Sequence, residues 1–416
     1  MRSRFHTTRW TGVLAVLALV LTVAGTTWAA GPKAYIGLFK DNAVGVFDTS
    51  TNRLLTTIPI PTGPHGLVVT PDGKTVFASS DGDSKVSVID TATDTVSASI
   101  EVGKSPHGLA LTPDGGTLLA AVFGANAVVF IDTASRTVLG QVLAASPHNI
   151  GITPDGKTAY VAAQGKSGVG LVILDVKGMR QTGFVALDKT PRALNLSPDG
   201  EKLYFTLAGA DAVQVLDTAT NTVLRQIPVG ASPHHTVFSP TGTRALVVSQ
   251  GPGTLSTLDW SKDTVTGTVK VGTLPHWIAL GPGGRTAYVT NETSGDLSVV
   301  NLDTMTVTAT IPVGNGPRKI VIQPAAASAA APASSGILSV AIASFAFPDT
   351  LRIKVGQSVS WANNDSVPHT VTADDGSWDS GDIAAGKAFT QVFRKAGTFT
   401  YHCSNHPAMT GTVIVS

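Results

Sequence analysis

A set of metal-binding side chains lies near the end of the chain. Cys403, His406 and Met409 follow one another at intervals of three residues, and His369 stands 34 residues before the cysteine. A thiolate, two imidazoles and a weakly bound thioether suit a copper ion that changes between Cu(I) and Cu(II). The short Cys-x2-His-x2-Met segment would place three ligands on one turn between strands. The sequence therefore predicts one redox-active copper centre at His369, Cys403, His406 and Met409.

Cys403 is the only cysteine among the 416 residues. An exported chain with one cysteine has no internal disulfide, and its thiol would be open to oxidation unless something occupied it. Burial and a bound metal would hold the side chain as a thiolate. A metal site is the simplest explanation for this single cysteine.

Residues 337–416 contain the four ligands and read as a series of short strands. Apolar and polar residues alternate in runs such as Leu351–Val359 and Thr412–Val415, and Gly and Asp turns separate the runs. This pattern is typical of a small β-sandwich. We therefore expect a small β-sandwich that carries the copper ligands.

The ligand segment and its surroundings resemble the cupredoxin family, and within it amicyanin and pseudoazurin. This resemblance implies one type 1 blue-copper ion. It also implies that Asn363 hydrogen-bonds across to the cysteine loop and that an apolar surface around His406 passes electrons to a redox partner protein. The similar segments are Val355–Trp361, Asn363, Val367–Val371, Asp379–Gly381 and Gly397–Tyr401.

His402 stands next to the cysteine and suggests a second interpretation. Copper nitrite reductases use the histidine beside the blue-copper cysteine to hold a catalytic copper. Alternation along a strand points His402 away from the side of Cys403 and toward the surface. Amicyanin-like domains carry a histidine at this position without a second metal. We therefore expect no catalytic copper at His402.

The preceding part of the chain is built from repeats. Proline followed by His or Arg recurs every 41 to 44 residues, and an apolar run follows each pair. Each unit then continues with a turn such as Thr112–Gly115 and further short runs rich in Val, Leu and Ile, which indicate strands. The recurring prolines are Pro64, Pro106, Pro147, Pro191, Pro233, Pro275 and Pro317.

Two features of the repeat predict local structure. The Pro-Asp-Gly step has the residues of a tight turn, because glycine accepts the positive φ needed to rejoin the next strand. An aspartate also closes the third strand of each unit, and we interpret it as the acceptor of a side-chain-to-backbone turn. These residues are Asp48, Asp90, Asp132, Asp175, Asp217, Asp259 and Asp303.

The phase of the repeats predicts a closed ring. The mature chain would open with a second strand at Ala34–Phe39, and the last first strand, Lys319–Gln323, has no continuation. Pairing the two ends completes one blade and removes exposed strand edges. We therefore expect an all-β protein with a seven-bladed β-propeller followed by a small cupredoxin β-sandwich. Residues 33–324 resemble the YVTN family of β-propellers, whose tetrapeptide stands at Tyr288–Asn291.

The residue after each repeat proline should lie near the central channel of the propeller. We call these seven residues the hub residues. They suggest an anion or substrate site, or a second metal centre, although proline and a polar residue also simply begin a strand. The hub residues are His65, His107, His148, Arg192, His234, His276 and Arg318.

Nitrous oxide reductase has a similar architecture, in which a seven-bladed propeller with a histidine-held copper cluster precedes a copper domain. The ligands differ here. Two hub residues are arginines, which do not bind metals, and the binuclear centre of that family needs two cysteines. The activity of that family is therefore not inferred for this chain.

The N-terminus and the composition predict export. Arg2, Arg4 and Arg9 precede an apolar run, Val13–Val23, that is too short to span a bilayer, so residues 1–29 read as a cleaved signal peptide. Without these arginines the formal charge changes from +1 to −2, which disfavours nucleic acid as a partner. We expect a periplasmic or extracellular protein without stable membrane insertion.

These segments predict the domain order and two functions. The propeller would span residues 30–324, an Ala/Pro/Ser linker residues 325–336, and the cupredoxin residues 337–416. The first function is electron transfer through one copper, with the propeller as a docking or ligand-binding module. The alternative is a copper-dependent oxidoreductase with an active site at the His/Arg hub, fed by the tethered cupredoxin.

Overall fold

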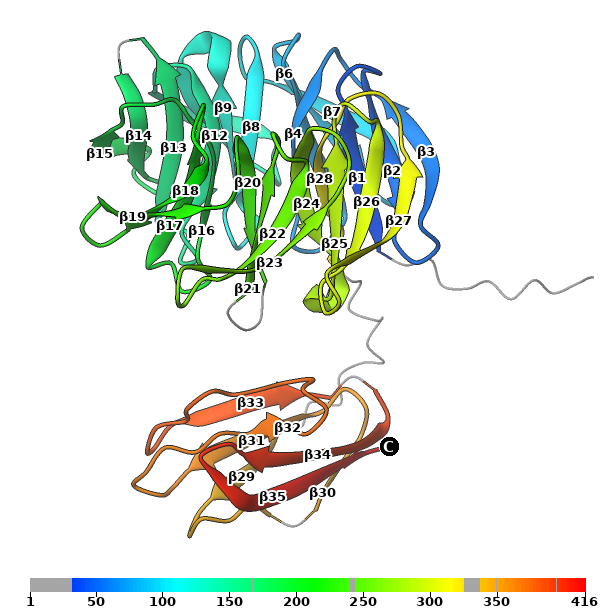
Figure 1. The fold of residues 1–416 in the computed structure, drawn as a ribbon, viewed down its shortest axis with the longest axis vertical. Helices are drawn as coiled ribbons and strands as arrows, with labels where there is room; N and C mark the ends of the chain where they lie inside the picture. Colours follow the sequence, from blue (N-terminus) through cyan, green and yellow to red (C-terminus); the bar gives the residue numbers. More distant parts are fainter. Residues whose placement is uncertain (1–31, 167, 240–243, 325–336, 349, 394) are drawn as a thin grey trace, which may run out of the picture. The chain divides into compact units, whose positions relative to one another are not determined.

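The structure is a computed structural model that describes residues 32–416 except 167, 240–243, 325–336, 349 and 394. The chain divides into two compact units, Met1–Gln323 and Pro324–Ser416 (Figure 1). The predicted signal peptide, residues 1–29, and the predicted linker, residues 325–336, lie outside the described residues. Among the described residues, no helix has both the length and the apolar character that crossing a bilayer requires.

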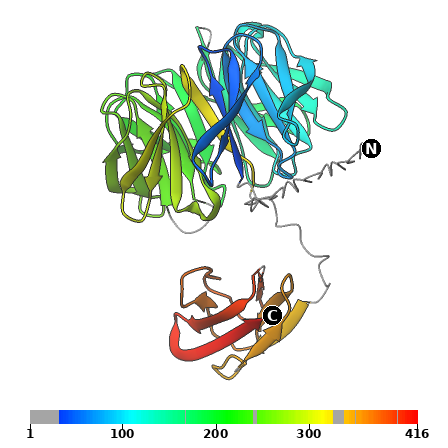
Figure 2. The same ribbon diagram turned by 90° about the vertical axis from the view of Figure 1, so that its right-hand side faces the viewer.

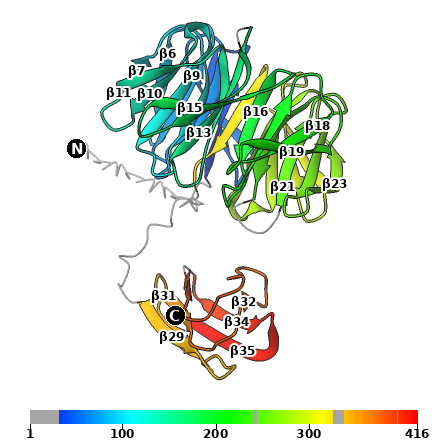
Figure 3. The same ribbon diagram turned by 90° about the vertical axis from the view of Figure 1, so that its left-hand side faces the viewer.

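The first unit consists of four-stranded antiparallel sheets, and only the short helices η1 (Phe123–Ala125) and η2 (Pro282–Gly284) interrupt its described strands. The first strand of each sheet begins at a repeat proline and contacts the first strands of the neighbouring sheets, and β28 contacts β4. The sheets therefore form a closed ring, seen from the two sides in Figures 2 and 3. The first strands are β4 (Pro64–Val69), β8 (Pro106–Leu111), β12 (Pro147–Ile152), β16 (Pro191–Leu196), β20 (Pro233–Phe238), β24 (Pro275–Leu280) and β28 (Pro317–Ile322).

The second and third strands of each sheet form its buried centre. Both of their faces pack against neighbouring sheets, which explains their near-continuous Val, Leu and Ile content. The second strands are β1 (Lys33–Leu38), β5 (Thr75–Ser80), β9 (Thr117–Val122), β13 (Thr158–Gly165), β17 (Lys202–Leu207), β21 (Arg244–Ser249) and β25 (Thr286–Asn291). The third strands are β2 (Ala43–Asp48), β6 (Lys85–Asp90), β10 (Ala127–Asp132), β14 (Gly168–Asp175), β18 (Ala212–Asp217), β22 (Thr254–Asp259) and β26 (Asp296–Asn301).

The fourth strands are the outer edges of the sheets and are largely exposed. Their exposed positions carry many Thr side chains together with Val and Leu residues that remain in contact with solvent. They are β3 (Arg53–Pro59), β7 (Thr95–Glu101), β11 (Thr137–Leu143), β15 (Arg180–Ala186), β19 (Thr222–Pro228), β23 (Thr264–Lys270) and β27 (Thr306–Pro312).

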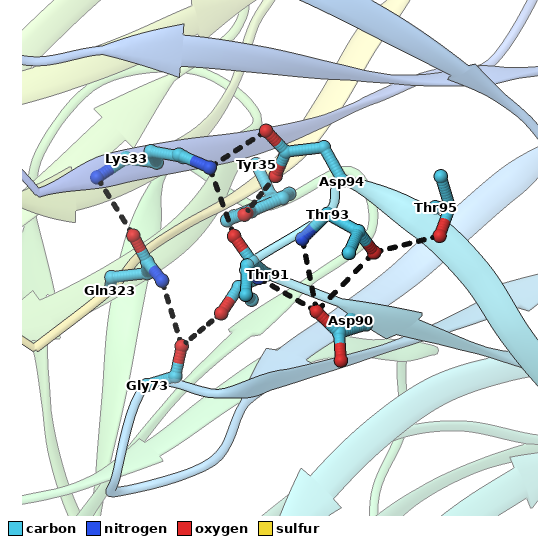
Figure 4. Close-up of polar contacts among 10 residues, drawn as sticks. Lys33, Tyr35, Gly73, Asp90, Thr91, Thr93, Asp94, Thr95 and Gln323 are labelled. Atoms are coloured by element: carbon cyan, nitrogen blue, oxygen red, sulfur yellow. Dashed lines mark hydrogen bonds and ion pairs between the residues drawn. The ribbon is translucent and has the colours of Figure 1, made fainter.

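The two ends of the first unit share one sheet, with the strand order β28–β1–β2–β3. β1 pairs with β28 in antiparallel register from Ala34 opposite Ile322. The predicted pairing of the last repeat strand with the N-terminal three strands is therefore confirmed. Polar contacts hold this sheet against the next one (Figure 4).

Asp94 is the central acceptor of these contacts. Its carboxylate accepts hydrogen bonds from Lys33 Nζ and the Tyr35 hydroxyl, both at 2.7 Å. Gln323 accepts from the backbone N–H of Lys33 at 3.1 Å and donates to the carbonyl of Gly73 at 2.7 Å. The contacts thus tie both strands of the closing pair to the turns of the adjacent sheet.

The aspartates that close the third strands form the predicted turns. Asp90, for example, accepts the backbone N–H groups of Ala92 and Thr93. Asp303 is the exception to the prediction. Asn301, at the end of β26, accepts the turn N–H groups there, and Asp303 instead lies 3.7 Å from the Arg244 guanidinium. The residue equivalent to the other six aspartates is therefore Asn301, two residues before the Asp303 that the sequence analysis assigned.

The second unit is a two-sheet sandwich, as predicted. One sheet has the order β29–β31–β33 and the other β30–β35–β34–β32. Trp361 and Tyr401 are fully buried between the sheets, where the Trp361 indole N–H donates to the Tyr401 hydroxyl at 3.0 Å. The strands are β29 (Ile337–Ile342), β30 (Leu351–Ile353), β31 (Ser358–Asn363), β32 (Thr372–Ala373), β33 (Ala388–Val392), β34 (Gly397–Cys403) and β35 (His406–Val415).

Replacing Asp94 tests the closure of the ring. We expect Asp94→Ala to lower the free energy of unfolding by about 2 kcal/mol more than Arg136→Ala does, because the buried Tyr35 hydroxyl and the partly buried Lys33 ammonium lose their acceptor. Arg136 is a matched control: it occupies the equivalent turn position, with a φ of 60° against 53° for Asp94, so the strain of a left-handed alanine cancels. Denaturant titration gives both values, and equal losses would contradict the assigned role of Asp94.

Candidate metal centre

Two of the predicted copper ligands lie on the turn that joins β34 to β35. Cys403 ends β34, His406 begins β35, and the two residues face each other in the strand register. This turn places His406 Nδ1 3.5 Å from Cys403 Sγ. The third ligand, His369, comes from the segment between β31 and β32, and its Nδ1 lies 3.7 Å from the same sulfur. The structure thus brings the three predicted residues together.

The distances fit one shared ion. Ligand bonds of about 2.0 to 2.3 Å at angles between tetrahedral and trigonal put a sulfur and a nitrogen about 3.5 to 3.8 Å apart. The observed separations of 3.5 and 3.7 Å agree with that range. Met409 is also buried, with 4% exposure, and belongs to the same core cluster as Cys403. The donor set of two imidazoles, a thiol and a nearby thioether suits copper.

Thr370 holds the Cys403 sulfur in place. The backbone N–H of Thr370 donates to Sγ at 3.2 Å, and the Thr370 hydroxyl accepts the N–H of Ser404 at 2.7 Å. Thr370 therefore links the His369 segment to the cysteine turn and stabilises the ligand that copper requires.

Asp365 orients His369 and was not identified from the sequence. Its carboxylate lies 3.0 Å from His369 Nε2, so that nitrogen carries the proton and Nδ1 is left as the acceptor. The backbone N–H groups of Ser344 and Phe345 donate to the same carboxylate and lower its pKa. Asp365 is an ordinary loop aspartate in the sequence, so no sequence signal marked this contact.

Asn363 has a different role from the one predicted. Its side-chain N–H groups donate to the carbonyls of Val367 and Ile383, both at 2.8 Å, and its oxygen accepts the N–H of Asp365. These contacts shape the segment that carries His369. The link across to the cysteine turn is made by Thr370 instead, because its backbone passes beside the sulfur.

An apolar patch covers one side of the centre. The Phe345 ring is 54% exposed, and its centroid lies 5.0 Å from the His406 ring and 5.4 Å from the His369 ring. Pro407 and Ala408 are exposed beside the half-buried His406. His402 points elsewhere: its Nδ1 lies 2.7 Å from the exposed Asp374 carboxylate. His406 is thus the ligand closest to solvent on an apolar surface.

The hub histidines of the first unit also lie close together. Ring centroids are 3.5 Å apart for His65 and His107, 4.0 Å for His107 and His148, and 4.1 Å for His234 and His276. The hub arginines lie beside polar partners: Arg318 pairs with Glu292 at 2.9 Å, and Arg192 donates to Gln250 at 3.3 Å.

Burial removes the charge that the sequence suggested for the hub histidines. It lowers the pKa of His65, His107 and His276 well below the usual value, to about 4 for His148 and to about 3 for His234. These rings are therefore neutral at pH 7. An anion-binding ring of charged histidines is not formed, because desolvation and the neighbouring charges oppose protonation.

Comparison with known protein families assigns each of the two units to a family. Residues 33–112 and 107–323 match the YNCE-like beta-propeller family. The chain belongs to this family. Residues 336–416 match the copper binding proteins of the plastocyanin/azurin family. The chain is therefore a fusion of a YNCE-like propeller with a copper-binding domain of the plastocyanin/azurin type, for which type 1 copper is the implied cofactor.

Individual relatives support the same division. The C-terminal unit is similar to amicyanin of Paracoccus denitrificans, with 33% identity over 93 residues, 21% of this chain and 71% of that protein. Amicyanin-alpha of Methylorubrum extorquens is 33% identical over 90 residues, 20% of this chain and 75% of that protein. Kuenenia stuttgartiensis hydrazine synthase shares the fold, with a TM-score of 0.60 and 21% identity over 64% of this chain and 91% of that one.

The Asp365 contact predicts an effect on copper binding. We expect Asp365→Asn to weaken Cu(II) binding by about tenfold or more, because a neutral amide leaves His369 a poorer electron donor. Asp374→Asn is the matched control, since it removes an equivalent carboxylate from the non-ligand His402. Competition with a chelator of known affinity measures both variants, and the prediction is wrong if the two bind copper equally.

The buried histidines predict a loss of stability in acid. Burial, together with the charge of Arg192 for His234 and of Lys319 for His235, lowers both pKa values. Between about pH 6.5 and 4 the unfolded chain therefore binds more protons than the folded one. The free energy of unfolding should fall as the pH falls, by up to about 1.4 kcal/mol per pH unit for each histidine.

Denaturant titrations at several pH values measure this slope. His235→Gln should reduce the slope, because it removes one of the buried imidazoles whose pKa is lowered. A slope that is the same for the wild type and His235→Gln would show that His235 titrates normally in the folded state.

Proposed function

We propose that this protein is an exported electron carrier in which His369, Cys403, His406 and Met409 hold one type 1 copper. The observation that carries the proposal is the convergence of two imidazole Nδ1 atoms on one buried thiol sulfur, at 3.5 and 3.7 Å. Bound copper supplies the chemistry by accepting and returning one electron. The protein residues supply a ligand set that is already assembled, so little atomic movement accompanies the change of charge.

Electrons would pass through His406. This ring is half-buried, and exposed Phe345, Pro407 and Ala408 surround it with apolar surface. A partner protein can pack against such a patch and exclude water, which brings its own redox centre close to the copper ligand. We therefore propose a redox partner protein that docks on this face.

Export is supported by the amino-terminal sequence. Three arginines precede a short apolar run in the first 29 residues, which is the pattern of a secretory signal. Uptake of copper in the periplasm or outside the cell agrees with a single cysteine that copper protects. The propeller would serve as a docking or ligand-binding module for the carrier.

A copper-dependent oxidoreductase is the second candidate. The observation that favours it is the cluster of neutral histidines at the hub, because neutral imidazoles are able to bind a metal. In that case the hub would be the active site, and the tethered copper domain would supply or remove electrons.

Absorption and spin-resonance spectra of the copper-loaded full chain test the first proposal. We expect an intense visible thiolate-to-copper band and about one copper per chain, both lost in Cys403→Ser. His402→Gln is the control, and it should keep the band, because this histidine points away from the sulfur. A Cys403→Ser variant that retains the visible band would exclude Cys403 as the ligand.

A further inference from the structure

His65 and His107 approach each other more closely than the other hub residues. Their ring centroids are 3.5 Å apart, and each histidine is followed by glycine in a Pro-His-Gly sequence. A Cβ on Gly66 would lie 2.2 Å from the carbonyl oxygen of His107. The strands β4 and β8 (Figure 1) therefore pack at a distance that only glycine permits, and this brings the two imidazoles together.

The free nitrogen of His107 is an acceptor. Its Nδ1 lies 3.1 Å from the carbonyl oxygen of His148 and so carries the proton. The lone pair is then on Nε2, which lies 3.8 Å from Asp81 Oδ2. The described residues offer the His65 ring no hydrogen-bond partner, although this side chain is 5% exposed. Two imidazoles and a carboxylate thus face one another, and His107 directs a lone pair at the carboxylate.

Asp81 is partly exposed, and one oxygen of its carboxylate lacks a partner. Its Oδ1 is buried without a hydrogen-bond partner among the described residues. Burial raises the pKa of Asp81 to about 6, although the charge of Arg318 opposes the shift. Arg318 itself is held by Glu292 at 2.9 Å and lies over the Phe39 ring. A positive ion beside Asp81 would stabilise the carboxylate.

We propose that His65, His107 and Asp81 bind a divalent transition-metal ion such as Zn²⁺ at the propeller hub. Their ligand atoms all lie within 4.8 Å of one another. Bonds of about 2.1 Å at tetrahedral angles put ligand atoms about 3.4 Å apart, close to the 3.8 Å between His107 Nε2 and Asp81 Oδ2. Two imidazoles and one carboxylate suit zinc, iron or copper better than calcium or magnesium.

This site does not depend on the copper centre. Its three residues belong to the first unit, and the copper ligands belong to the second. The site also uses neither hub arginine, which removes the objection that arginine does not bind metals. It would provide the hub of the oxidoreductase alternative with a metal, and it differs from an all-histidine cluster because a carboxylate takes part.

Zinc binding to the copper-loaded full chain tests the site. With copper filling the cysteine site, we expect about one Zn²⁺ per chain after dialysis, counted by mass spectrometry, and a rise in the unfolding temperature of the propeller with added Zn²⁺. Asp81→Asn and His107→Gln should each weaken Zn²⁺ binding by at least about tenfold. Asp114→Asn is the control, because its carboxylate lies in an exposed turn, and it should bind as the wild type does.

The outcomes separate this site from the copper proposal. Unchanged Zn²⁺ affinity in both Asp81→Asn and His107→Gln, or no Zn²⁺ bound by the wild type, would overturn the hub site whatever the copper spectrum shows. Asp81→Asn keeps the shape of the side chain, so a wild-type far-ultraviolet circular dichroism spectrum and unfolding temperature of the propeller in this variant exclude misfolding as the cause of a loss. Loss of the blue band alone would concern only the cysteine centre.

Discussion

The approach of two imidazoles to one buried thiol is the arrangement on which the function depends. Cys403 and His406 face each other across the β34–β35 turn, so the strand register sets one of the two distances. His369 arrives from another segment, and Thr370 and Asp365 fix that segment against the sulfur and the imidazole. The ligands are therefore assembled by the protein before a metal binds, which lowers the reorganisation that electron transfer requires.

The propeller is built by repeating one structural unit. One repeat provides a hub residue, a tight turn and a buried pair of strands, and the closed ring leaves only the short outer strands as edges. The ring must be held where the chain begins and ends, and Lys33, Tyr35 and Asp94 make that contact. Similar contacts recur where a tyrosine is available, as between Tyr160 and Asn221.

Structural features that depend on a repeated sequence pattern or on a rare residue type could be predicted from the sequence. The single cysteine and its spacing to His406 and Met409 indicated copper, and the offset of the repeats indicated which ends pair. The ligand spacing is set within one short turn, and the strand pairing is set by the length of one repeat, so both can be recognised in the sequence. The fold class and the cofactor could therefore be predicted before the structure was known.

Contacts made by loops from distant segments could not be predicted in this way. Asp365 and Asp81 are ordinary aspartates in the sequence, and only the tertiary fold places one behind His369 and the other beside His107. The neutral state of the hub histidines follows from burial at the centre of the ring, which composition does not reveal. The partners of Asn363 also differ from those that the family resemblance implied: its side chain bonds within the loop that carries His369, and Thr370 makes the contact with the sulfur.

X-ray absorption at the copper edge of the copper-loaded full chain tests the central claim most directly. The account predicts one sulfur at the short distance of a thiolate and two imidazole nitrogens around each copper. A copper surrounded only by nitrogen and oxygen, with no short sulfur bond, would contradict it.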